Sequence, residues 1–304
     1  MTTYEQSITV IIHTKNSANT LQRTLDSVSW ATEVLVVDMH STDETLQIAK
    51  KNKVRIETVP DYGYVEPARN AAINMAKSGW ICIVDSDEVI SEKLATKLQQ
   101  LAQGDATADA YWIARKNIVF GGWLHSAGWW PDYQLRFFKK GTVGWPEKIH
   151  ATPKIDGTID YLTDSEDLAI EHFNYPDVAS FLERLNRYTT HEVSDRQKKD
   201  VSQETLVNAW SNEFFSRVFV HKGIDGGVRG LGISWLQAMY ELVVQLKMWE
   251  QQQNTEHPNT RSEEGIKAIE KFSRDLNYWI ADYKIRQSSG LTQLVWRVRR
   301  TLKV

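Results

Sequence analysis

Cysteine is almost absent from this sequence of 304 residues, which contains only Cys82. A single cysteine cannot form a disulfide bond within the chain, so nothing in the composition indicates an oxidising compartment. The sequence also lacks the basic and then apolar start of a signal peptide, and it has no uninterrupted run of about 18 apolar residues that could span a bilayer. These absences lead us to expect a cytoplasmic protein.

An excess of positive charge is also missing. The chain has 36 basic and 39 acidic residues, for a net charge of -3, whereas dedicated nucleic-acid-binding proteins usually have a basic excess. Hydrophobic residues make up 41% and charged residues 25% of the chain, which is typical of a soluble globular protein.

Short apolar runs alternate with amphipathic segments through the first hundred residues. The runs predict strands at 8–14, 33–39, 54–59 and 80–85, and the segments between them predict helices at 19–28, 41–51 and 66–77. Ser41 and Glu44 predict a capping box, Pro67 a helix start and Ser91 the cap of a further helix. Continuous apolar strands joined by helices indicate a parallel sheet that is covered on both faces.

The pattern changes after the first hundred residues. Two longer strands are predicted at 108–120 and 133–140, joined by a loop rich in glycine and tryptophan, and almost everything after residue 176 has a helical pattern. We therefore expect an α/β domain over residues 1–176 and a helical region over residues 177–304.

Acidic residues follow two of the predicted strands directly. Asp38 ends the second strand, and the fourth ends in Asp85, Ser86 and Asp87. Continued alternation would place Asp85 and Asp87 on one side, where their repulsion would cost roughly 1–4 kcal/mol at a surface-like dielectric. A bound Mg²⁺ or Mn²⁺ that also holds a diphosphate would relieve this repulsion. The alternative is a polar strand end followed by a helix cap.

Several segments, in this order, resemble the motifs of family 2 glycosyltransferases, which have the GT-A fold. They read ITVIIHTKN, VLVVDMHSTDET, ARNAAINMAKSGWICIVDSDE and RFFKKG. Later segments, such as HSAGWWPDYQLRFF and EHFNYPDVASFLERLNRYT, are similar to the branch of lipopolysaccharide-core β-glucosyltransferases. The resemblance implies a Rossmann-like mixed sheet flanked by helices with a helical C-terminal extension, a nucleotide-diphosphate sugar as donor, and a divalent metal cofactor bound at a DXD motif.

The resemblance also implies roles for particular side chains. It places Thr14 and Asn16 in the base and ribose pocket, Asp38 on the base or ribose, Arg69 on the base or diphosphate, Asp85 on the ribose or a metal-bound water, and Asp87 and His172 on the metal. His172 could instead be a satisfied histidine at a strand end, and Arg69 could form a surface ion pair.

Inverting transfer requires a base that takes the proton from the acceptor hydroxyl, and a carboxylate suits this role. Related sequences have a His-Glu pair at the position where this chain has His150 and Ala151, so the expected glutamate is missing. Glu147 and Asp132 are equal candidates for its role. His150 could also serve as the base, because its ordinary pKa is near neutrality, and it is otherwise expected to contact substrate.

Tryptophans gather in the loop between the two longer strands. Trp129 and Trp130, with Trp123 and His125, could form a wall for a sugar or lipid acceptor, or they could pack in the core. Near the end of the chain, residues 291–302 combine an apolar stripe with basic residues, a pattern typical of helices on anionic membranes. A docking helix or a dimer contact is the alternative.

Taken together, these features predict an inverting, metal-dependent hexosyltransferase. It would move a hexose from a nucleotide-diphosphate sugar, expected to be a UDP-sugar, to a lipid-linked glycan or lipopolysaccharide core, and it would lie peripherally on the inner face of the cell membrane. The alternative is a non-catalytic protein that binds a nucleotide sugar or glycan at the membrane. A nucleotidyltransferase is less favoured, because HTKNSAN stands where a glycine-rich phosphate loop would follow the first strand.

Overall fold

The computed structural model describes residues 3–63, 65–146, 152–195, 200–252 and 262–303. The chain divides into two compact units, which are Met1–Ile118 with Trp130–Asn174, and Val119–Trp129 with Tyr175–Val304. The predicted boundary after residue 176 lies close to the third crossing between the units, which follows Asn174. The loop 119–129 belongs to the same unit as the C-terminal helices.

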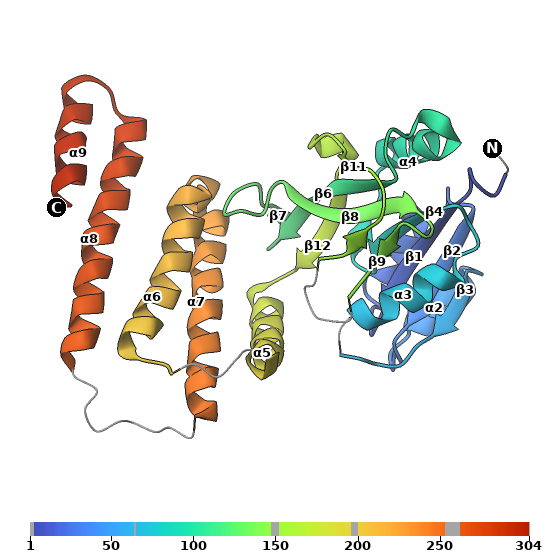
Figure 1. Cartoon of the computed structure of the whole chain (residues 1–304), viewed down its shortest axis with the longest axis horizontal. Helices are drawn as coiled ribbons and strands as arrows, with labels where there is room; N and C mark the ends of the chain where they lie inside the picture. The colour runs from blue at the N-terminus through green and yellow to red at the C-terminus, as the bar shows by residue number, and fades with distance from the viewer. Residues whose placement is uncertain (1–2, 64, 147–151, 196–199, 253–261, 304) are drawn as a thin grey trace. The chain divides into compact units, whose positions relative to one another are not determined.

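A mixed ten-stranded sheet forms the centre of the α/β fold (Figure 1). Its strands are β1 (Ile8–Thr14), β2 (Glu33–Asp38), β3 (Arg55–Thr58), β4 (Trp80–Asp85), β5 (Glu88–Val89), β6 (Ala110–Val119), β7 (Gly122–Trp123), β8 (Asp132–Lys139), β11 (Ile159–Tyr161) and β12 (Ile170–Tyr175). The main order is β3-β2-β1-β4-β8-β6-β12-β5. Strands β3, β2, β1 and β4 are parallel, and β8 runs antiparallel to β4 and β6. The expected α/β class with a mixed sheet is confirmed. A separate two-stranded sheet joins β9 (Val143–Gly144) to β10 (Lys154–Ile155).

Helices cover both faces of the parallel strands, which explains why those strands are apolar throughout. Val10 and Ile12 of β1 pack in one core cluster with residues of α1 (Leu21–Ser27), α2 (Thr45–Lys51) and α4 (Glu92–Gln100). Ile11, which points to the other face, packs in a second cluster with residues of α3 (Glu66–Met75). Alternate residues of one strand therefore contribute to two cores.

The helix starts follow the sequence signals in two cases out of three. Pro67 lies in the first turn of α3, and the Ser91 hydroxyl accepts a hydrogen bond from Leu94 N, as predicted. The capping box at the start of α2 is wrong, because that helix begins at Thr45 and has no such side-chain cap. The Ser41 hydroxyl instead accepts from Asn16 N at 2.9 Å, so the loop after β1 uses the group that would have capped the helix.

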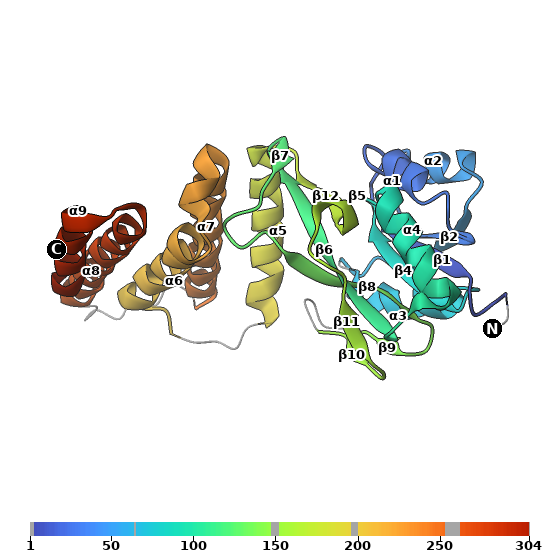
Figure 2. The same cartoon turned by 90° about the horizontal axis from the view of Figure 1, so that it is seen from above.

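The second unit contains the helices α5 (Val178–Asp195), α6 (Gln203–Phe215), α7 (Gly227–Gln251), α8 (Ser262–Gln287) and α9 (Gly290–Leu302). Helix α7 packs against both α5 and α6, and α8 packs against α6 and α9 (Figure 2). Gly230 permits a close approach within this unit, because a Cβ there would lie 2.4 Å from the carbonyl oxygen of Gly223. None of the helices in the described part of the chain is long and apolar enough to cross a membrane.

We predict that Ser91→Ala lowers the free energy of unfolding by about 1 kcal/mol, because Leu94 N would lose its N-cap acceptor. Urea unfolding measures the change. Thr96→Ala on the same helix is the matched control. The Ser91 hydroxyl donates to Asp167 O and the Thr96 hydroxyl to Glu92 O, so both variants lose a bond to a backbone oxygen, but only Ser91 caps the helix. Equal losses in the two variants would contradict the capping role.

Candidate functional site

A tight turn brings the acidic residues after β4 to the sheet edge. Strand β4 ends at Asp85, Ser86 and Asp87 form the turn, and β5 begins at Glu88. The expectation that extended alternation would continue through Asp87 is therefore wrong. The turn is fixed in part by Ser86, whose hydroxyl lies 2.8 Å from that of Ser17 and whose carbonyl oxygen accepts from Thr24.

A buried arginine holds two carboxylates of this turn. Arg136 of β8 is 2% exposed, and its guanidinium forms ion pairs with Asp85 and with Glu88, the latter at 2.7 Å. The other oxygen of Glu88 accepts from Asp85 N at 2.9 Å. Glu88 is fully buried, and a buried carboxylate needs a positive partner of this kind beside it.

The pKa values of this group follow from the same contacts. Burial opposes the charge on Asp85, but Arg136 and then Arg69 outweigh burial and hold the pKa of Asp85 well below its usual range. Burial likewise opposes the charge on Arg136, but Asp85 and Glu88 raise its pKa above the usual value. Asp85 is therefore an ionised carboxylate over the whole physiological pH range.

His172 lies beside Asp87, and its tautomer can be inferred from its hydrogen bonds. Its Nε2 is 3.6 Å from Asp87 Oδ1, and its Nδ1 is 2.7 Å from Asn117 Oδ1. Asn117 donates through its amide nitrogen to Asp132, which orients its oxygen toward the histidine. In the neutral ring Nδ1 therefore carries the proton, and the lone pair of Nε2 is directed toward Asp87.

Asp132 is held by three donors. Arg115 lies 2.6 Å from Asp132 Oδ2, Asn117 donates to the same oxygen at 3.0 Å, and Gln134 donates to Oδ1 at 2.9 Å. Burial opposes its charge, but Arg115 and these hydrogen bonds outweigh burial and lower its pKa. Arg115 also approaches Glu88 at 3.6 Å. These contacts join eight side chains into one connected network, which runs in the order Asp87, His172, Asn117, Asp132, Arg115, Glu88, Arg136 and Asp85.

The donor set around Asp87 suits a divalent cation that is completed by substrate. One carboxylate oxygen and one neutral imidazole nitrogen, 3.6 Å apart, could both contact one ion at typical bond lengths of about 2.0–2.1 Å. No cluster of three or more acidic, histidine or cysteine ligands occurs among the described residues. A cation held here would therefore take its other ligands from water and from substrate phosphates, as Mg²⁺ commonly does.

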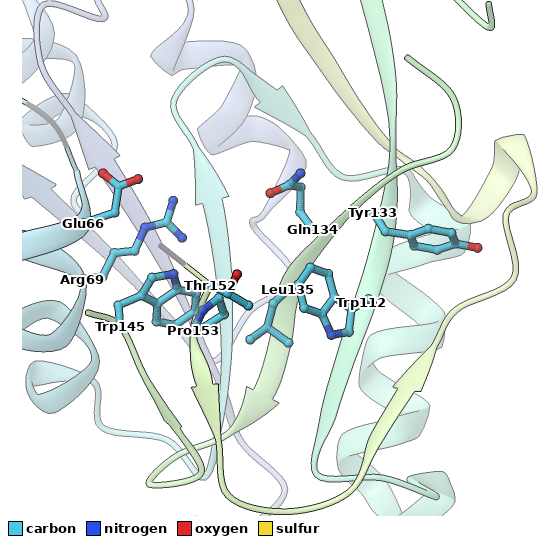
Figure 3. A pocket seen from close by; sticks show the side chains of 9 residues that line it. All are labelled: Glu66, Arg69, Trp112, Tyr133, Gln134, Leu135, Trp145, Thr152 and Pro153. Atoms are coloured by element: carbon cyan, nitrogen blue, oxygen red, sulfur yellow. The ribbon is translucent and has the colours of Figure 1, made fainter. Parts of the chain in front are cut away.

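Arg69 lines a pocket of about 260 Å³ in the same unit (Figure 3). Its guanidinium lies 5.0 Å from the ring centre of Trp145, and its Nε has no hydrogen-bond partner among the described residues. Glu66, Trp112, Tyr133 and Gln134 also line the pocket, and Gln134 connects it to Asp132. A cation beside an aromatic ring in an open pocket is suited to binding an anionic group.

The residues expected around the nucleotide base are already hydrogen-bonded within the protein. Asp38 is buried and accepts from Thr14 Oγ1 at 3.2 Å and from Ser41 N at 3.0 Å. The side-chain oxygen of Asn16 accepts from Thr42 N at 2.8 Å. These bonds join the loops after β1 and β2, so the predicted contacts of Thr14, Asn16 and Asp38 with a nucleoside would be made by an ordered pair of loops.

Four further candidates lie elsewhere or are not described. Glu147 and His150 fall outside the described residues. Trp129 is half-buried in the helical unit, with its ring edge-on to Tyr175 at 6.1 Å, and Trp130 is the first residue of the return to the α/β unit. The acceptor wall stays a prediction.

Four residues of the network received no role from the sequence, namely Glu88, Arg115, Asn117 and Arg136. Arg136 lies within the recognised RFFKKG segment, which could have drawn attention to it. Arg115 and Asn117 had a weaker signal, since they are polar residues within the long strand β6.

A mixed sheet with acidic residues at the ends of its parallel strands, and with a pocket lined by Arg69 in the same unit, is the arrangement expected of an enzyme that binds a phosphorylated donor. The chain belongs to glycosyl transferase family 2, whose model matches residues 9–153.

Individual relatives agree with this assignment. An uncharacterized glycosyltransferase of Rickettsia prowazekii (strain Madrid E) is 34% identical over 244 residues, which cover 73% of this chain and 81% of that protein. Chondroitin synthase of Pasteurella multocida (strain Pm70) is 27% identical over 174 residues, or 51% of this chain and 18% of that protein. A crystal structure of S. aureus TarS (residues 1–349) aligns with 83% of this chain and 93% of its own, at 15% identity and a TM-score of 0.43, a likeness too weak to bear on function.

His13 gives this site a pH dependence that can be measured. It pairs with Asp85 across β1 and β4 and is 5% exposed. Burial, and then the charge of Arg69, lower its pKa from 6.5 to about 3. Between these values the unfolded chain binds the proton and the folded chain does not, so stability falls as the pH falls below about 6.5.

We predict that the free energy of unfolding falls by about 2 kcal/mol as the pH is lowered from about 7 to about 5, because the unfolded chain binds a proton at His13 that the folded chain does not. His13→Gln should remove this share of the pH dependence, whereas His191→Gln, at an exposed position, should leave it unchanged. Denaturant unfolding at the two pH values measures both slopes. Parallel slopes for wild type and His13→Gln would exclude a buried neutral histidine.

Proposed function

We propose that this family 2 glycosyltransferase transfers a hexose, with inversion, from a nucleotide-diphosphate sugar to a lipid-linked glycan or a lipopolysaccharide core. We propose a UDP-sugar as the donor and Mg²⁺ or Mn²⁺ as the cofactor. The observation that carries the proposal is the pair of Asp87 and His172, which offers two metal ligands in the same connected network as Asp132. Family membership supports the transfer itself.

In this proposal the donor diphosphate lies between two features of the α/β unit. Asp87 and His172 would hold the cation, which neutralises the charge that develops on the departing nucleoside diphosphate. Arg69 would contribute a second positive charge from the pocket side. Asn117 holds the His172 ring in the tautomer that leaves Nε2 able to bind a metal, a positioning role typical of residues behind metal ligands.

Asp132 is proposed as the base that accepts the proton of the acceptor hydroxyl. Its lowered pKa keeps it ionised, and its side chain is 23% exposed, so a hydroxyl can approach it. Arg115, Asn117 and Gln134 fix its orientation. Glu147 is the competing candidate.

The acceptor side of the proposal rests on aromatic side chains. Trp112, Tyr133 and Trp145 line the pocket, and Trp129 and Trp130 are predicted to contribute a wall for the acceptor. Flat apolar rings suit the faces of sugars. A lipid-linked acceptor would require the enzyme to work at a membrane, for which we propose the inner face of the cell membrane.

We predict that Mn²⁺ increases the thermal stabilisation of the protein by its nucleotide sugar and that Asp87→Asn abolishes this increase. A ligand that binds only the folded state raises the apparent melting temperature, so a screen of UDP, GDP, ADP, CMP and dTDP sugars with and without Mn²⁺ identifies the donor. Loss of one of two protein ligands should remove the metal-dependent part of the shift.

Asp26→Asn is the matched control, because Asp26 is an exposed aspartate outside the network. It should respond to Mn²⁺ as the wild type does. A full Mn²⁺ response in Asp87→Asn would refute the metal role of Asp87, and the absence of stabilisation by any nucleotide sugar would refute the donor assignment.

We predict that Asp132→Asn lowers kcat by about a hundred- to ten-thousandfold, the usual contribution of a positioned base. Nucleotide-sugar binding, measured by thermal shift, should remain, because the substituted group acts on the acceptor. Release of nucleotide in the presence of donor and acceptor measures turnover. Glu147→Gln is the paired variant: near-normal turnover is expected, and the reverse ranking of the two variants would assign the base to Glu147.

A further inference from the structure

Helix α9 carries a continuous apolar stripe with no partner among the described residues. None of its side chains is buried, and Leu291 is 83% exposed. The stripe consists of Leu291, Leu294, Val295, Val298 and Leu302, all of them more than half exposed. Their spacing of three, four and seven residues places them on one face of the helix.

The stripe points away from the helix that supports α9. Three half-buried side chains of α9 face α8: Gln293 donates to Ile285 O at 3.1 Å, Arg300 pairs with Asp282 at 2.7 Å, and Trp296 lies between them on the same face. At about 100° per residue, the centre of the stripe lies roughly 160–180° around the helix from this group. The hairpin of α8 and α9 is visible in Figure 1.

Positive charges flank the stripe on both sides. Arg299 follows one edge of the stripe and Arg297 the other, and both are exposed. Arg300 and Lys303 are already paired with Asp282 and Asp275 of α8. The sequence contains no acidic residue after Asp282, whereas α8 itself carries acidic and basic residues in pairs such as Lys271 with Asp275.

We propose that this face of α9 docks on an anionic lipid surface. The five apolar side chains would enter the boundary between headgroups and acyl chains, and Arg297 and Arg299 would reach lipid phosphates at its edges, as long basic side chains do. A second copy of the chain is the less favourable occupant, because two such faces would bring arginines together without acidic partners. The proposal concerns a surface outside the transfer site and stands independently of the proposed reaction.

Co-sedimentation of the full chain with vesicles tests the proposal. We expect binding to vesicles of phosphatidylcholine with phosphatidylglycerol, weaker binding to pure phosphatidylcholine, and loss of binding as NaCl screens the charges. Replacing Arg297 or Arg299 by Gln should weaken binding by about fivefold each, the equivalent of one basic residue near a charged membrane.

A matched pair of variants distinguishes binding through the apolar stripe from binding through positive charge alone. Val298→Glu places a carboxylate in the stripe, and Thr292→Glu places one outside the stripe, on the Arg299 side of the same helix, so the first should abolish binding and the second should only weaken it. Circular dichroism should show unchanged helix content in both variants. Both should also keep the thermal shift with nucleotide sugar, whereas a loss of that shift would mean that the variant had lost donor binding. No binding of the wild type to anionic vesicles, equal effects of the two variants, or self-association that Val298→Glu removes would overturn the proposal.

Discussion

The buried guanidinium of Arg136 is the interaction on which the acidic site depends. It forms ion pairs with Asp85 and with the fully buried Glu88, and so places a positive charge between two carboxylates at the sheet edge. Because Glu88 also accepts from the backbone of Asp85, the arginine fixes the course of the β4–β5 turn as well as its charge. Together with the bonds of Ser86 to Ser17 and Thr24, this ion pair helps to set the position of Asp87 in that turn.

The network beyond Arg136 gives similar residue types different tasks. Asp85 and Glu88 are paired with buried charge, Asp132 is held by neutral and cationic donors, and Asp87 lies beside an imidazole lone pair. Four carboxylates within one connected group thus have three kinds of environment. Such differences, and not the number of acidic residues, separate structural carboxylates from those available for chemistry.

Much of this architecture could be predicted from the sequence, because strands that are buried on both faces appear in it as uninterrupted apolar runs. The parallel strands are apolar throughout, and the first strand matches its predicted range at residues 8–14. Predictions of local polar geometry did less well. Ser41 was expected to cap a helix but bonds a neighbouring loop, and Asp87 was expected to continue a strand but lies in a turn. In both cases the deciding partner is distant in sequence, so no local pattern could reveal it.

The amide of Asn117 shows what a connected network implies for the meaning of a single substitution. This one side chain orients His172 through its oxygen and Asp132 through its nitrogen. Removing it would perturb the proposed metal ligand and the proposed base together, and the energetic effects of changes at these three positions would not sum. A double-mutant cycle between His172 and Asp132 would therefore show coupling through a shared partner, because Asn117 bonds both of them.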